Sequence, residues 1–288
     1  NDSEPRISMK PIQTTWLKIT GLLLTLGILG AITAISIIDN TIPKMQSTTL
    51  RLLTLANPDA ADPLRIAFLS DLHFNGDLES AVRLEQLLAR VIAAQPDVIL
   101  LGGDYTTAVT NEADLRDLRA VFAEIFSKTK GIPVVAVLGN HEAWTALPRW
   151  RASLQSAGIA VLENEVLVLE GLGLCIRGLG DYYSGGYRFT DFPAKCGNLA
   201  ALTLTHDPAV AFQPGIEGLV LAGHTHCGQV SLPFIGAPWA PSSAPSEAHC
   251  GLYSDEIRRV LVTPGIGTSV LPVRLGTQAQ WELVTLYR

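Results

Sequence analysis

The sequence predicts an α/β domain preceded by one N-terminal transmembrane helix. Three observations lead to this fold class. An uncharged apolar run lies near the N-terminus, short apolar segments then alternate with helical periodicity, and short apolar segments dominate the second half of the chain. The chain is therefore divided into an N-terminal extension (1–18), a transmembrane anchor (19–38), a linker (39–63) and one large domain (64–288).

The run from Ile19 to Ile38 is long enough to cross a lipid bilayer. Twenty helical residues rise about 30 Å, which is the thickness of the hydrocarbon core. Trp16 precedes the run, and tryptophan is favoured at the membrane interface. We favour an uncleaved anchor over a signal peptide, although Ala34-Ile35-Ser36 would be a passable cleavage site. A buried helix of a soluble protein fits less well, because the run has no polar face.

Basic residues on the two sides of this run indicate its orientation. Arg6, Lys10 and Lys18 precede it, whereas Lys44 and Arg51 follow at a greater distance. By the positive-inside rule, this small excess places the N-terminus in the cytoplasm. The sequence therefore predicts a single-pass membrane protein whose large domain lies on the non-cytoplasmic side.

The charge balance argues against a nucleic-acid partner. The chain has 21 Lys and Arg against 27 Asp and Glu, which gives a net charge of −6. No basic patch stands out that would bind a phosphate backbone. We therefore expect a protein that does not bind nucleic acid.

Four cysteines, Cys175, Cys196, Cys227 and Cys250, leave the redox state open. No pair has the C-x-x-C spacing of a zinc ribbon. Two disulfides are possible, in three connectivities, but we favour four unpaired thiols.

The first half of the large domain has a β-α-β-α-β pattern. Before it, the linker contains a β-compatible stretch, Thr49–Leu55. Short apolar runs typical of buried strands are Leu64–Ser70, Asp97–Leu101 and Val134–Leu138. Apolar residues recur at helical spacing in Leu78–Ala94 and Glu112–Phe126, which separate these runs. This order predicts parallel strands with helices on the sheet.

The second half is mostly β. One more helix is expected at Leu147–Ala157. The predicted strands that follow it are Val166–Leu169, Leu174–Leu179, Ala200–Thr205, Leu219–Ala222, Val260–Thr263 and Glu282–Leu286. Residues 233–248, rich in Pro, Ser and Ala, are expected to form a long loop.

Residue types that bind metals follow five of the predicted strands. They are Asp71 and His73, then Asp104, then Asn140 and His141, then His206, and finally His224 and His226. Ligands bind at the carboxyl ends of strands in open α/β sheets, so we expect these groups to converge on one edge. Asp71 and His73, at positions i and i+2, point to the same side of an extended segment and can hold one ion. Mixed carboxylate, imidazole and amide ligands suit Mn, Fe or Zn better than Mg or Ca.

The series D-x-H, G-D, G-N-H-E, H and G-H-T-H resembles the calcineurin-like metallophosphoesterases. The resemblance implies a four-layer α/β/β/α sandwich with two divalent metal ions at one edge. It implies that the first metal is held by Asp71, His73 and His226, and the second by Asn140, His206 and His224, with Asp104 bridging them. It also implies that His141 touches the substrate phosphate and protonates the leaving group.

A narrower resemblance rests on two further segments. Gly223–Pro233 and Gly265–Thr268 are similar to bacterial membrane-associated phosphodiesterases, near the pyrophosphatases of lipid A precursors. Members of that branch often have Gly at the position of Cys227. The difference places Cys227 beside the metals, where we expect a packed neutral thiol.

These features predict a two-metal phosphoesterase that hydrolyses a phosphodiester or pyrophosphate with a metal-bound hydroxide. A lipid-linked substrate is expected, because the anchor keeps the domain near a membrane and the loop Leu232–Trp239 is apolar. The alternative is a metal-stabilised, non-catalytic binding or scaffold protein at the membrane. Structural zinc sites are usually closed around one ion by four ligands, whereas seven ligand candidates occur here.

Several other residues near these motifs have bland interpretations. We expect Glu142 to support the ligands or to begin a helix rather than to bind metal. An exposed turn is favoured over a substrate pocket for Asp181, Tyr182 and Tyr183. A surface position is expected for Arg177, Arg188 and His249.

Overall fold

The computed structural model describes residues 18–28, 30, 43–51, 62–107, 112–129, 131–232 and 234–287. Residues 18–28 are helical and exposed, at the start of the predicted anchor. The rest of that anchor, apart from residue 30, lies outside the described residues. Within the part of the chain that is described, no helix is both long and apolar enough to cross a membrane. The anchor therefore stays a prediction.

The first sheet has six strands in the order β1-β12-β2-β3-β4-β5. Their bounds are β1 Lys44–Arg51, β2 Leu64–Leu69, β3 Val98–Leu101, β4 Val134–Ala136, β5 Ala160–Val161 and β12 Gln280–Tyr287. Strands β2 to β5 run parallel, as the β-α-β-α-β pattern predicts. Strand β12 is antiparallel to β2, and β1 is parallel to β12, so the sheet is mixed.

Strand β1 lies inside the segment that the sequence predicts to be a linker. Its side chains are almost all exposed, and only Leu50 is buried. The strand therefore has no apolar pattern, and its pairing with the C-terminal strand, from Lys44 opposite Gln280 onward, defines it.

The second sheet has the order β10-β11-β9-β8-β7-β6. Its strands are β6 Glu165–Leu169, β7 Leu174–Gly178, β8 Ala200–Leu204, β9 Gly218–Ala222, β10 Gly251–Ser254 and β11 Arg258–Val262. The four inner strands are parallel, and β6 and β10 pair antiparallel at the two edges. The second half of the chain is thus mainly β, as predicted, although β5 and β10 were not expected.

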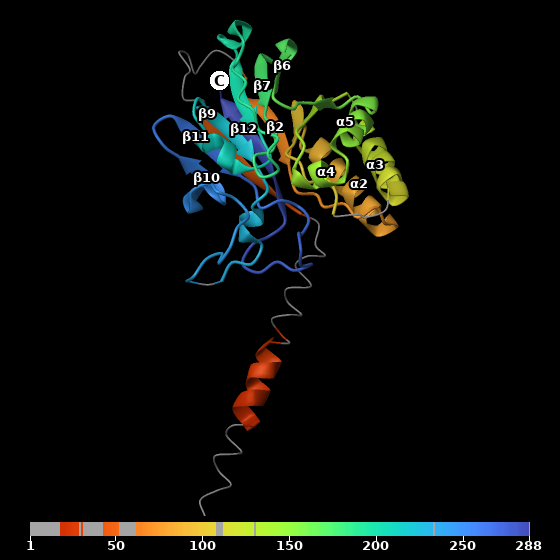
Figure 1. Cartoon of the computed structure of the whole chain (residues 1–288), viewed down its shortest axis with the longest axis vertical. Coiled ribbons are helices and arrows are strands. Elements are labelled where there is room, and N and C mark those ends of the chain that lie inside the picture. Colours follow the sequence, from red (N-terminus) through yellow and green to blue (C-terminus); the bar gives the residue numbers. More distant parts are fainter. Residues whose placement is uncertain are drawn as a thin grey trace, which may run out of the picture.

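Four α-helices gather on one side of the molecule (Figure 1). They are α2 Leu78–Ala93, α3 Glu112–Ser127, α4 Asn140–Thr145 and α5 Leu147–Ser156. Helix α2 begins where the Asp77 side chain accepts a hydrogen bond from the Ser80 amide, which satisfies one of the free N–H groups of the first turn. Its buried face, which includes Leu84, Leu87 and Val91, packs on the outer face of the first sheet.

A second apolar core lies between the two sheets. Phe68 and Leu100 of the first sheet pack there with Ile176 and Leu202 of the second. This arrangement is a sandwich of two mixed sheets, as the resemblance implies.

The outer face of the second sheet differs from the expected fourth layer. Among the described residues it is covered by loops and by the short 3-10 helix η3, Pro208–Phe212, rather than by an α-helix. Residues 205–217, which link β8 to β9, contain Pro208, Pro214 and Gly215, and they are too few and too turn-rich for a full crossover helix. The other 3-10 helices are η1 Glu170–Leu172, η2 Ala194–Cys196, η4 His226–Gly228 and η5 Ser246–Ala248.

The prediction of four unpaired thiols is wrong. Cys175 pairs with Cys196, with Cα atoms 5.8 Å apart, and Cys227 pairs with Cys250, with Cα atoms 4.7 Å apart. Cys227 is therefore not a packed neutral thiol. Each partner follows at a distance of more than twenty residues, and the sequence does not show that the fold brings them together.

Two surface assignments are also wrong. Arg177 is buried, donates hydrogen bonds to the Thr203 hydroxyl and stacks over the Phe192 ring. His249 is half-buried, and its Nε2 lies 2.8 Å from the Ala244 carbonyl. Arg188 is exposed, as predicted.

Candidate metal centre

The predicted metal-ligand residues converge on one edge of the sandwich, at the carboxyl ends of β2, β3, β8 and β9 and at the start of α4. All are nearly inaccessible to solvent. Among the described residues, ligand atoms within 4.8 Å of one another form three groups: Asp71, His73 and His226; His73, Asp104 and His141; and Asp104, His206 and His224. Asn140 joins the third group, since its Oδ1 lies 3.1 Å from His206 Nε2.

The first group combines one carboxylate with two imidazoles. Asp71 Oδ1 lies 3.4 Å from His226 Nε2, which in turn lies 3.0 Å from His73 Nε2. His73 Nδ1 lies 3.2 Å from the Thr106 carbonyl, so we assign the ring proton to Nδ1. This hydrogen bond leaves the Nε2 lone pair directed at the other two side chains, as metal ligation requires.

The second group repeats this arrangement. His206 Nδ1 lies 2.8 Å from the Gly102 carbonyl, so its Nε2 is free to bind a cation. His224 donates from Nε2 to the Pro241 carbonyl, and its Nδ1 faces His206 Nε2 at 3.1 Å. In each of these imidazoles a backbone carbonyl fixes the tautomer and the ring orientation.

The carboxylate of Asp104 lies between the two groups. Its Oδ2 is 3.3 Å from His206 Nε2 in one group and 3.9 Å from His73 Nε2 in the other. Its Oδ1 accepts a hydrogen bond from the backbone N–H of His141 at 3.0 Å. Asp104 is thus placed to touch two cations at once, and the donor set fits a pair of metal ions.

Burial dominates the electrostatics of these side chains. It raises the pKa of Asp71 and lowers the pKa of His73 to about 4. Burial likewise lowers the pKa of His226 well below its ordinary value, and His73 and Arg274 lower it further. Burial opposes the charged form of His206 as well, but the negative charge of Asp104 outweighs it and raises the pKa of His206. A bound cation would displace that proton, so metal binding and proton release are coupled here.

Five of the ligand candidates have left-handed backbone conformations, which are rare outside glycine. They are Asp71 (φ 52°), His73 (45°), Asp104 (52°), His224 (67°) and His226 (50°). Such residues cost about 1–3 kcal/mol each and persist only where the surroundings enforce them. Glycine is required beside them: a Cβ on Gly139 would collide with the Asp104 carboxylate, and one on Gly223 with that of Asp71.

Glu142 supports the centre without belonging to either ligand group. It is fully buried near the start of α4 and accepts hydrogen bonds from the backbone N–H groups of Asp104, Tyr105 and Gly139, at 2.8–2.9 Å. Burial raises its pKa to about 7, and Asp104 contributes. The prediction of a helix-start carboxylate that supports the ligands is confirmed.

Two residues at the site were missed from the sequence. Arg274 is completely buried, with Nη2 3.3 Å from His226 Nδ1 and 2.8 Å from the Pro264 carbonyl. Trp144 is exposed, and its ring centroid lies 5.1 Å from that of His141. The signal for Trp144 was its position three residues after His141, which places both on one face of a helix.

Trp144 and Tyr183 approach each other beside the centre. Their rings are 6.2 Å apart, and the Tyr183 ring lies 4.8 Å from that of His224. Tyr183 is exposed in a turn, as expected, but it also adjoins the site.

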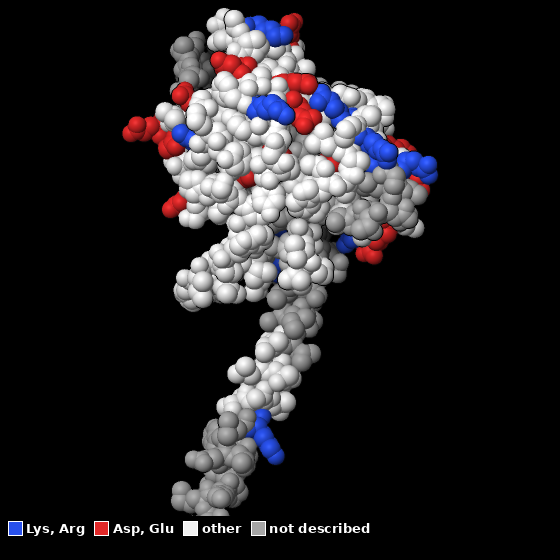
Figure 2. All heavy atoms as spheres, in the orientation of Figure 1, with Lys and Arg blue, Asp and Glu red and all other residues white. Residues whose placement is uncertain are grey.

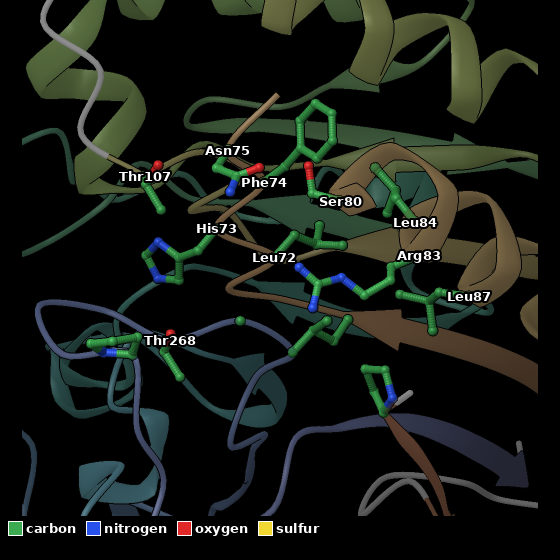
Figure 3. A pocket seen from close by; sticks show the side chains of 14 residues that line it. Leu72, His73, Phe74, Asn75, Ser80, Arg83, Leu84, Leu87, Thr107 and Thr268 are labelled. Carbon is green, nitrogen blue, oxygen red and sulfur yellow. The ribbon is translucent and has the colours of Figure 1, made fainter. Parts of the chain in front are cut away.

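A cleft of about 350 Å³ adjoins the metal centre at His73 (Figure 3). Its apolar lining includes Leu72, Phe74, Leu84, Leu87 and Ile266, and its polar lining includes Asn75, Ser80, Arg83, Thr107 and Thr268. In Figure 3, His73 lies at one side of the cleft and Arg83 towards the other. The cleft can receive a substrate group that has both apolar and anionic parts.

The sandwich and its paired ligand groups define a binuclear metal-dependent hydrolase, with a buried His/Asp metal-binding site. The model of the calcineurin-like phosphoesterase family matches residues 64–228, more than half of the chain. The chain belongs to this family and is a metallophosphoesterase. The non-catalytic scaffold that the sequence left open as an alternative is therefore not favoured.

Two relatives and one solved structure are similar to the chain. Phosphodiesterase YaeI of Escherichia coli (strain K12) is 31% identical over 79% of this chain and 84% of its own length. A transmembrane protein with metallophosphoesterase domain from Danio rerio is 27% identical over 93% of this chain, which spans 61% of that protein. A 5'-nucleotidase precursor from Thermus thermophilus covers 77% of this chain and 55% of its own at 15% identity, with a TM-score of 0.44, too low to carry an argument.

Proposed function

We propose that the protein is a membrane-anchored phosphodiesterase or pyrophosphatase that works with two divalent transition-metal ions, Mn, Fe or Zn. The observation that carries the proposal is the position of the Asp104 carboxylate between two ligand groups. When bound, the two cations would supply a water of lowered pKa and positive charge opposite the phosphoryl oxygens. The similarity to phosphodiesterase YaeI supports diester hydrolysis.

In this proposal His141 acts on the substrate. Its Nε2 lies 3.8 Å from Asp104 Oδ2, and its ring stands edge-on to that of His73 at 4.8 Å between centroids. Its buried Nδ1 has no hydrogen-bond partner among the described residues. No backbone carbonyl therefore fixes its tautomer, in contrast to His73, His206 and His224. A ring that is free to exchange its proton suits a general acid that protonates the leaving oxygen.

We further propose that residues 19–38 anchor the chain and that the domain lies on the non-cytoplasmic side. Two disulfides support this location, because disulfides persist in oxidising compartments and are rare in the cytosol. The similarity to a transmembrane protein from Danio rerio supports an anchor.

The proposed substrate is a lipid-linked phosphodiester or pyrophosphate. The cleft at His73 supports it, since its floor is apolar and Arg83 offers a cationic group to a polar headgroup. The cleft is also lined by Pro43, so its mouth lies where the chain arrives from the predicted anchor.

The test is hydrolysis of bis(p-nitrophenyl) phosphate by the full chain, after metal removal and reloading with Mn, Fe or Zn. Turnover that depends on metal and is lost in Asp104→Asn supports the proposal. A fully loaded protein without turnover of any phosphodiester, lipid phosphodiester or lipid pyrophosphate would overturn it. Comparing a lipid pyrophosphate with its water-soluble headgroup analogue tests the substrate class, because equal catalytic efficiency on both would rule out lipid selectivity.

A further inference from the structure

Two loops beside the metal centre expose large apolar side chains. Residues 230–246 follow η4, and residues 263–273 follow β11. The most exposed apolar side chains are Phe234 and Val270, at 108% and 93%, and Ile235, Trp239 and Leu271 are more than half exposed. Soluble surfaces rarely present so many large apolar groups together unless they bind something.

Hydrogen bonds join the two loops into one unit. The Gln229 side chain donates to the Leu271 carbonyl and accepts from the Ser269 amide, both at 2.8 Å. The backbone adds a bond from Leu275 N to Gln229 O at 3.0 Å and one from Ser231 N to Leu275 O at 2.6 Å. The apolar side chains of both loops therefore belong to one surface, which we call the apolar platform: Phe234, Ile235, Trp239, Val270 and Leu271.

The platform carries no charge. Residues 230–246 and 260–273 contain no Asp, Glu, Lys, Arg or His. Figure 2 shows an uncoloured projection at the lower end of the domain, while blue and red side chains gather on its upper part. A protein partner usually meets charged groups at the rim of its interface, whereas an uncharged loop tip rich in Phe, Ile and Trp suits the boundary of a lipid bilayer.

The platform lies at the end of the domain where the chain arrives from the apolar run 19–38. Pro43 and Pro272 line the same cleft, and Lys44 N donates to Ala279 O at 3.0 Å. Four residues, 39–42, separate the run from Pro43. Four residues span about 15 Å at most, so a run that crosses the bilayer holds this end of the domain at its surface.

We propose that the apolar platform inserts into the lipid interface as a second membrane contact, in addition to the anchor. The contact fixes the orientation of the domain, which a single helix and a short linker leave open. It also places the cleft near the headgroups, because η4 of the platform loop begins at His226 and Ile266 and Thr268 of the other loop line the cleft. The inference rests on the proposed anchor and does not require turnover.

The test places a fluorescent probe on the platform of the full chain, reconstituted in phosphatidylcholine vesicles. All four native cysteines form disulfides, so a thiol introduced by Phe234→Cys or Val270→Cys is a unique labelling site. Ile257→Cys is the matched control, since Ile257 is an exposed apolar residue next to the amino end of β11, opposite the platform. Quenching is measured with lipids brominated in the acyl chains and with iodide in the water.

Probes at residues 234 and 270 should lose most of their fluorescence to brominated lipid and little to iodide, and the probe at 257 should show the reverse. Equal behaviour at all three positions would overturn the proposal. Shielding of residues 234 and 270 from both quenchers would also overturn it, because the platform would then be covered by protein, from this chain or a second copy.

A second measurement separates docking from catalysis. The double variant Phe234→Ser and Val270→Ser should raise KM for a diester presented in vesicles by about tenfold, while kcat/KM for bis(p-nitrophenyl) phosphate stays unchanged. Ile257→Ser should leave both values unchanged. If the double variant behaves like Ile257→Ser on vesicles, the platform does not dock. The labelling result stands or falls even if no diester is turned over, so failure of the proposed function is distinguishable.

Discussion

Glu142 holds Asp104 in place through the backbone rather than through the side chain. Its Oε2 accepts hydrogen bonds from the N–H groups of Asp104 and Gly139, each at 2.9 Å, and its Oε1 accepts from Tyr105 at 2.8 Å. One buried carboxylate thus joins the strand end that carries the shared ligand to the start of α4, which carries Asn140 and His141.

The first prediction concerns this support. Glu142→Gln replaces one acceptor oxygen with an amide donor, which would face backbone N–H groups and leave them unsatisfied. We expect a loss of about 1–3 kcal/mol in the free energy of unfolding and a 10- to 100-fold weaker metal affinity. Denaturant unfolding and metal titration measure these effects, with the exposed Glu256→Gln as control. Wild-type metal affinity in Glu142→Gln would show that Asp104 does not depend on this carboxylate.

The second prediction separates the roles of the two disulfides. They close loops of similar length, with sequence separations of 21 and 23 residues, so loss of either should cost about 3 kcal/mol of stability. Cys227 directly follows His226, and it shares the left-handed conformation. We therefore expect Cys250→Ser with Cys227→Ser to lower metal content as well, whereas Cys175→Ser with Cys196→Ser should lower only the unfolding temperature. Equal metal content in the two double variants would contradict this.

The third prediction tests His141 as a general acid. His141→Ala should lower kcat by about 10²- to 10⁴-fold while metal content stays near two ions per chain. The defect should shrink for p-nitrophenyl esters, whose leaving group departs without a proton. Steady-state kinetics on good and poor leaving groups, with elemental analysis, provide the measurement. Loss of metal in this variant would instead make His141 a ligand.

The fourth prediction concerns metal removal. Chelation leaves two buried carboxylates and four imidazoles facing one another without a cation between them, in a backbone that is already strained. The metal-free chain should therefore unfold at a lower temperature and recover fully on addition of two equivalents of Mn, Fe or Zn. Scanning calorimetry with stepwise metal addition measures this. Saturation of the recovery at one equivalent would argue against a binuclear centre.

The fifth prediction concerns the aromatic residues beside the centre. Trp144→Ala removes the ring that faces both His141 and Tyr183, so a leaving group that stacks there loses about 0.5–1.5 kcal/mol of binding. KM for bis(p-nitrophenyl) phosphate should rise about two- to tenfold with little change in kcat. Trp239→Ala, on the apolar platform, is the control and should not affect this soluble substrate. A large fall in kcat for Trp144→Ala would point to a role in positioning His141.

The sequence alone determined the residues that form the centre. Asp71, Asp104 and His206 each follow an apolar run that the solvent-free interior forces into a strand, and parallel strands bring their carboxyl ends to one edge. The residue types could therefore be grouped before any contact was known. The same local signals located α2, because its apolar residues recur at helical spacing and an Asp caps its start.

Only the tertiary structure decided features that depend on distant neighbours. Strand β1 forms because β12 offers it a partner, Cys227 pairs with Cys250 because the chain returns after 23 residues, and Arg177 is buried because Thr203 and Phe192 surround it. None of these has a periodic or local signature. Burial of a polar or sulfur-containing side chain is stabilised by its partners, and those partners become adjacent only when the two sheets have packed together.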